Sequence, residues 1–190
     1  MYLVSREVKE QLQQSLKRKN KMSENINIDK TSSDEEIYSI LIRQARSLIS
    51  PDEPMISSLS NITALLKDAF DKISWVGFYF LKEDKLYLGP FQGKVACTII
   101  NLGSGVCGTS AEKQETIVVQ DINDFPGHIA CDAGSKSEIV VPLLKNGTVY
   151  GVLDIDSYKY SSFNETDKKY LEEICKLLVS ELKLEQFSIS

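Results

Sequence analysis

The spacing of hydrophobic residues predicts helices on both sides of the chain's central region. Apolar side chains recur every three or four positions over residues 37–48, 55–70 and 171–182, as in helices that bury one face. Ser33 and Glu36 stand three residues apart just before the first of these segments, which is the pattern of a capping box. The chain is therefore expected to open and close its folded part with helices.

The pattern changes to that of β-strands between the second and third helical segments. Residues 75–81 are rich in aromatic side chains, and shorter apolar runs follow at 86–88 and 95–100. These three runs predict three strands that follow the second helix.

The clearest hairpin joins residues 138–144 to residues 148–156. Asn146 and Gly147 stand between the two runs, and this dipeptide readily adopts the positive φ angles of a tight hairpin turn. Pro142 has no amide hydrogen, so we expect it at a sheet edge or at a bulge.

Together these elements predict an α+β fold, with a central antiparallel β-sheet and the N- and C-terminal helices on one of its faces. Residues 101–137 are rich in Gly, Ser, Asp and Cys, and they are expected to form a long, irregular, cysteine-bearing insertion. We assign residues 31–190 to this single domain. Residues 1–30 are expected to be a flexible N-terminal extension.

Composition excludes several classes of protein. The 190 residues are 42% hydrophobic and 26% charged, and no apolar run is long enough to span a membrane. The net charge is −5 although residues 1–21 are basic, so the rest of the chain is acidic and poorly suited to nucleic acid. The first residues lack the apolar run of a secretory signal. We therefore expect a cytoplasmic protein that binds neither nucleic acid nor membrane.

The four cysteines are expected to be reduced thiols in that compartment. Cys175 falls within a helical apolar pattern and is expected to be a packing residue. The other three, Cys97, Cys107 and Cys131, fall in the central region, where two of them could form a redox pair that supplies two electrons. Three buried, inert cysteines are one alternative to this hypothesis.

A zinc site formed by the same three cysteines and His128, the only histidine, is a second alternative. The absence of paired C-x₂-C spacing speaks against zinc, and no metal is expected. We do not count His128 among the catalytic residues, because a lone loop histidine equally well binds nearby backbone.

Three acidic residues form a second candidate group. Glu138 and Asp154 are expected near the open end of the hairpin, and Asp154 and Asp156 share one face of their strand. Clustered acids raise one another's pKa, so one of them can hold a proton near neutral pH, and such a cluster also suits an ammonium group. Solvated carboxylates at a sheet edge are the alternative.

Several motifs, taken in order, resemble the free methionine-(R)-sulfoxide reductases, an enzyme family with the GAF fold. The matching stretches are 75–79, 89–97, 105–108, 125–132, 137–142 and 151–157. The resemblance runs from about residue 33 to residue 183 and includes all three cysteines of the central region.

The resemblance implies the reduction of free L-methionine (R)-sulfoxide, with thioredoxin as the electron donor and no bound cofactor. It favours Cys131 over Cys107 as the nucleophile that becomes a sulfenic acid. Cys97 or Cys107 would then form a disulfide with it. It also implies that the acidic residues contact the sulfoxide and the amine of the substrate, while the proton donor among them stays open.

The family assigns Trp75 and Tyr79, which share one face of a predicted strand, to the walls of the substrate pocket. Simple core packing is the alternative for both. A homodimer is the family's expected assembly. The competing function is a non-catalytic GAF module that binds a small molecule or senses redox state, although ligand binding alone would not require three loop cysteines.

Overall fold

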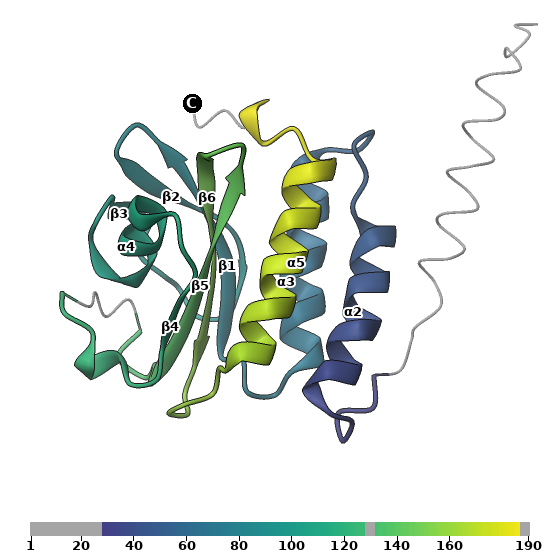
Figure 1. Cartoon of the computed structure of the whole chain (residues 1–190), viewed down its shortest axis with the longest axis horizontal. Coiled ribbons are helices and arrows are strands. Elements are labelled where there is room, and N and C mark those ends of the chain that lie inside the picture. The colour runs from purple at the N-terminus through teal and green to yellow at the C-terminus, as the bar shows by residue number, and fades with distance from the viewer. Residues whose placement is uncertain (1–27, 128–131, 187–190) are drawn as a thin grey trace, which may run out of the picture.

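The computed structural model describes residues 28–127 and 132–186 (Figure 1). Residues 1–27, almost all of the predicted N-terminal extension, lie outside these ranges. Over the described ranges, no helix combines the length and the apolar character that crossing a membrane requires.

Three long helices form where the hydrophobic spacing predicts them. They are α2 (Asp34–Leu48), α3 (Met55–Ala69) and α5 (Glu165–Glu181). α2 begins with the predicted capping box, in which Ser33 and Glu36 exchange side-chain to backbone hydrogen bonds. The side chain of Asn164 caps α5.

Within the described residues, the sheet has six strands in the order β3-β2-β1-β6-β5-β4, and every neighbouring pair is antiparallel. The strands are β1 (Trp75–Lys82), β2 (Lys85–Gln92), β3 (Ile99–Asn101), β4 (Ile117–Val119), β5 (Ser137–Lys145) and β6 (Thr148–Ser157). Asn146 and Gly147 connect β5 to β6 with φ angles of 53° and 78°, which confirms the predicted hairpin. The register of that pair shifts just after Pro142, which confirms the predicted irregularity.

The sheet separates two hydrophobic cores. α2, α3 and α5 lie on one side of it, whereas α4 (Gly105–Lys113) lies on the other (Figure 1). Along β1, Val76 and Phe78 pack into the helix-covered core, and Trp75 and Tyr79 pack into the core beneath α4. This alternation confirms an α+β domain with the terminal helices on one face.

Two of the predicted elements were wrong in detail. Residues 95–98 are not part of a strand. Two carbonyls of their segment accept from side chains instead: that of Lys94 from Trp75 Nε1, and that of Cys97 from the Tyr79 hydroxyl. Residues 101–137 are not one irregular insertion, since they contain α4, β4 and a short 3₁₀-helix. α4 was missed because its nine residues include two glycines and have weak helix propensity.

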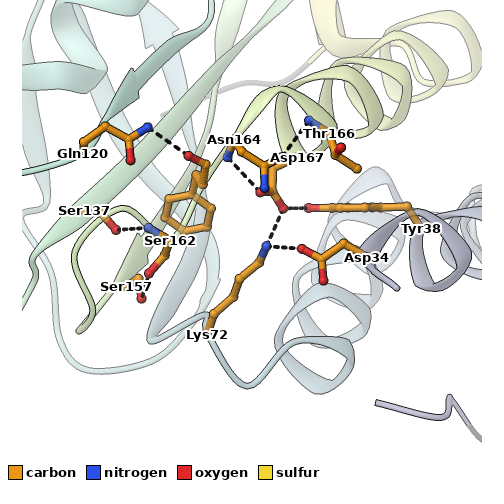
Figure 2. A network of polar contacts seen from close by, with 11 residues as sticks. Asp34, Tyr38, Lys72, Gln120, Ser137, Ser157, Ser162, Asn164, Thr166 and Asp167 are labelled. Carbon is orange, nitrogen blue, oxygen red and sulfur yellow. Dashed lines mark hydrogen bonds and ion pairs between the residues drawn. The ribbon is translucent and has the colours of Figure 1, made fainter. Parts of the chain in front are cut away.

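A partly buried polar network connects the helices to the sheet (Figure 2). Lys72, just before β1, forms ion pairs with Asp34 (2.5 Å) and with the fully buried Asp167 (2.7 Å). The hydroxyl of Tyr38 also donates to Asp167, at 2.8 Å. The starts of α2, α5 and β1 are therefore held together at one end of the sheet, the end from which Trp75 begins β1.

Candidate active site

The paired strands β5 and β6 bring the three predicted acidic residues together. Glu138 lies directly opposite Asp156, and Asp154 follows on the same face of β6. We call Glu138, Asp154 and Asp156 the acid cluster. Glu138 and Asp154 are only 6% and 7% exposed, which contradicts the alternative of solvated carboxylates at a sheet edge.

α4 places a thiol against this cluster. Ligand atoms of Cys107, Glu138 and Asp154 all lie within 4.8 Å of one another. Cys107 and Glu138 each share a hydrogen bond with Asp154, whereas its buried Oδ1 atom has no hydrogen-bond partner. The acid cluster and the first turn of α4 line a cavity of about 40 Å³. Its described lining residues are Ile100, Ser104, Gly105, Val106, Cys107, Asp132, Ser135, Glu138, Asp154 and Asp156.

Burial makes protonated carboxyl groups stable in this cavity. It raises the pKa of Glu138 well above its usual range, and the charges of Asp154 and Asp156 raise it further. The pKa of Asp156 is also well above its usual range, first through burial and then through the charge of Asp154. Burial raises the pKa of Asp154 only to about 6, because hydrogen bonds from Cys107 and Glu138 favour its ionised form. Asp154 is therefore the member that ionises first, and Glu138 keeps a proton.

Asp132 is a cavity residue that sequence reasoning missed. Its carboxylate accepts from the Gly134 amide (2.9 Å) and the Tyr158 hydroxyl (2.7 Å), and it pairs with Lys94 at 3.4 Å. The Gly134 amide is the main reason why the pKa of Asp132 lies below its usual range. Its place at the end of the 125–132 motif was the one available signal, and periodicity gave none.

Trp75 and Tyr79 lie on the site face of β1, beside β6. Their rings are stacked with centroids 6.1 Å apart, and Trp75 also stacks on Phe91 at 5.4 Å. A Cβ atom at Gly77 would collide with the Trp75 ring, so glycine leaves the space that this ring fills. Neither ring is among the described lining residues of the cavity. Both instead donate hydrogen bonds of 3.0 Å to the segment that carries Cys97.

The three described cysteines differ in redox state. Cys97 is half of a disulfide, whereas Cys107 and Cys175 carry free thiols. Cys107 is buried, and this burial raises the pKa of its thiol well above the usual value. Two predicted residues, the candidate nucleophile Cys131 and the loop residue His128, lie outside the described residues.

One group of described side chains has the geometry to hold a metal ion, namely Cys107, Glu138 and Asp154. This group differs from the zinc alternative drawn from the sequence. Of that alternative's four ligands, Cys97 is disulfide-bonded, and His128 and Cys131 are outside the described ranges.

Comparisons with known proteins agree with this fold. The GAF domain model matches residues 57–180. GAF domain-containing protein A of Dictyostelium discoideum is 49% identical, over 83% of this chain and 99% of its own length. The free methionine-R-sulfoxide reductase of Saccharomyces cerevisiae is 43% identical, over 82% of this chain and 91% of its own.

A solved structure is similar as well. It is the X-ray structure of free methionine-R-sulfoxide reductase from Neisseria meningitidis in complex with its substrate, with a TM-score of 0.77, 43% identity, and coverage of 82% of this chain and 93% of that one. The class defined by the fold and the family model is that of GAF-domain proteins. Within this class, the chain belongs to the free methionine-(R)-sulfoxide reductase family. This membership confirms the predicted family and the predicted oxidoreductase class.

Proposed function

We propose that this protein reduces free L-methionine (R)-sulfoxide to L-methionine. The observation that carries the proposal is the acid cluster, which gathers three carboxyl groups in one cavity. Such a cluster can bind an ammonium group through its ionised member and still donate a proton from another member. Reduction of a free amino acid that carries a sulfoxide requires both an anionic partner for its ammonium group and a proton for its sulfoxide oxygen.

The cavity suits both charged ends of a free amino acid. The acid cluster can bind the ammonium group, and the first turn of α4 lines the same cavity. The backbone amides at Gly105 and Val106 belong to this turn, and an α-helix favours anions at its N-terminus. Gly105 has a φ angle of 60°, which favours glycine at the start of the turn. The substrate carboxylate is therefore expected beside α4.

In the first chemical step, the thiolate of Cys131 attacks the sulfoxide sulfur. The sulfoxide oxygen takes a proton and passes to the cysteine, which leaves a sulfenic acid and one molecule of methionine. Asp156 is our choice of proton donor, because its raised pKa keeps it protonated, and because it is partly exposed and lines the cavity. The proton of Glu138 is already shared with Asp154.

In the second step, the thiol of Cys97 attacks the sulfenic acid and releases water, which leaves a disulfide. Two observations favour Cys97 over Cys107 for this resolving role. Cys97 takes part in a disulfide, and Cys107 is a buried thiol engaged with Asp154. A dithiol protein of the thioredoxin class then supplies two electrons by thiol–disulfide exchange.

The decisive experiment is an NADPH-coupled thioredoxin assay with the separate R and S sulfoxides, each free and peptide-bound. We expect turnover with the free R sulfoxide alone, because a peptide bond removes the ammonium group that the acid cluster binds. Comparable turnover on peptides contradicts the free-amino-acid assignment. Saturable binding without NADPH consumption favours the sensory module instead.

A further inference from the structure

We propose that the hydroxyl groups of Ser137, Ser157 and Ser162 are positioning groups that hold Glu138 and Asp156 side by side. We call these three residues the serine brace. The catalytic consequence of this inference rests on the proposed function, whereas the brace itself is a property of the fold and can be tested without substrate.

Each of the two paired strands carries one brace serine next to one acid. Ser137 precedes Glu138, Ser157 follows Asp156, and Ser137 lies directly opposite Ser157. Side chains alternate along a strand, so the serines face the helix-covered side of the sheet and the acids face the cavity. Both serines are fully buried, at 0% exposure.

Ser162 links the two serines across the ends of the strands (Figure 2). Its backbone amide donates to Ser137 Oγ at 3.3 Å, and its hydroxyl donates to Ser157 Oγ at 2.8 Å. Ser137 also donates to the carbonyl of Lys159 (2.7 Å), and the Lys159 amide donates to Ser157 Oγ (3.1 Å). The chain after β6 is thereby fastened to the first residue of β5 and the last residue of β6.

The same segment is anchored on its other side by the end of β4. The side-chain amide of Gln120 donates to the carbonyl of Phe163 at 3.0 Å, and the carbonyl of Gln120 accepts from the Ser161 amide at 2.9 Å. Asn164 follows and begins α5. The segment that carries Ser162 is therefore bonded to the residue that follows β4 and leads directly into α5.

The brace opposes a repulsion that arises when the acid cluster ionises. Among the described residues, three further titratable groups face the acid cluster: Cys107 from α4, Tyr79 from β1, and Asp132 from the segment that precedes β5. None of these three groups is a cation. The ammonium group of Lys94 is paired with Asp132, at 3.4 Å. Like charges directly opposite each other destabilise a strand pair. Ionisation of the cluster would therefore spread the two strand ends, and the brace resists this from the opposite face.

The first test is the substitution Ser162→Ala, which keeps the backbone donor and removes one hydroxyl from a partly exposed position. We expect single-turnover methionine release to slow by about 10-fold, since small displacements of catalytic groups are costly. We also expect the rate to decline at a pH about 0.5–1 unit lower than in wild type, because acids that are separated and hydrated lose their proton more easily. Ser162→Thr keeps the hydroxyl and should restore both values.

A matched control separates positioning from ordinary stability. Ser58 is also buried, accepts a hydrogen bond from the Ser50 amide and donates one to the carbonyl of Leu48, both at 3.3 Å, within the helix layer. Ser58→Ala should lower stability without moving the rate profile. Ser157→Ala, in contrast, should reproduce the shift seen with Ser162→Ala.

A measurement without substrate keeps the brace testable if the proposed function fails. Because its pKa values are raised, the acid cluster contributes stability that is present below about pH 4 and is lost as the pH rises through the folded-state values. Ser162→Ala should flatten this fall. Equal slopes in wild type and variant overturn the brace, and a flattened slope with an unshifted rate profile overturns its catalytic role. A wild type that releases no methionine overturns the proposed reduction alone.

Discussion

Glu138 lies directly opposite Asp156 in the antiparallel pair of β5 and β6, so both carboxyl groups face one cavity. Their roles differ because their neighbours differ. Glu138 shares its proton with Asp154, whereas a hydrogen bond between Asp156 and the Ser135 side chain favours the ionised form of Asp156 and partly offsets its raised pKa. The pair thus combines a fixed proton with one that is available to a ligand.

Substitution of these two acids should therefore have unequal effects. Asp156→Asn removes the proposed proton donor, and loss of a general acid typically slows a reaction by about 10²–10⁴-fold. Glu138→Gln keeps a donor toward Asp154, so a smaller loss is expected. The rate of single-turnover methionine release is measured for both variants. Glu181→Gln, which changes an exposed carboxylate, is the control. Equal rates in wild type and Asp156→Asn would place the proton donor elsewhere.

Asp154→Asn should stabilise the folded protein at neutral pH. The folded-state pKa of Asp154 is about 6, above its ordinary value of 3.8, so the carboxyl contributes stability below about pH 4 that is lost as the pH rises through 6. Removing the charge should recover about 1–3 kcal/mol at pH 7.5 and almost nothing at pH 4. Urea unfolding at the two pH values measures the difference. An equal change at both pH values would mean that packing, and not ionisation, sets the effect.

The polar network behind the sheet should matter for stability. Lys72→Met leaves the fully buried Asp167 without its cation, and breaking a buried ion pair in this way costs about 3–5 kcal/mol. Lys169 pairs with Glu35 at 3.6 Å on the surface, so Lys169→Met is the matched control and should cost less than about 1 kcal/mol. Chemical denaturation compares the two, and equal losses would contradict a structural role for Lys72.

Sequence patterns predicted those parts of the fold that local rules determine. The capping box at Ser33 and the turn at Asn146-Gly147 depend on neighbouring residues only, and both are confirmed. The acid cluster could be anticipated because strand alternation and one hairpin determine it. α4 could not, because its position against the cluster depends on tertiary packing of a short segment with weak helix propensity. The contact between Cys107 and Asp154 therefore has no sequence signal.

Electron flow gives the most direct test of the cysteine assignments. Cys131→Ser should release no methionine, because no sulfenic acid can form. Cys97→Ser should release one equivalent and then stop, since the sulfenic acid has no partner for the disulfide that thioredoxin reduces. Mass spectrometry after dimedone treatment should find the trapped sulfenic acid in this variant and not in wild type.

The matched control for these variants is Cys175→Ser, which changes a buried thiol in the helix-covered core, on the far side of the sheet from the acid cluster. It should cycle at the wild-type rate at temperatures where it stays folded. The informative contrast is Cys107→Ser. If this variant stops after one equivalent while Cys97→Ser continues to cycle, Cys107 is the resolving cysteine, and the disulfide at Cys97 lies outside the catalytic cycle. If both variants stop after one equivalent, electrons pass through both thiols, and the burial of Cys107 beside Asp154 then requires α4 to move during each turnover.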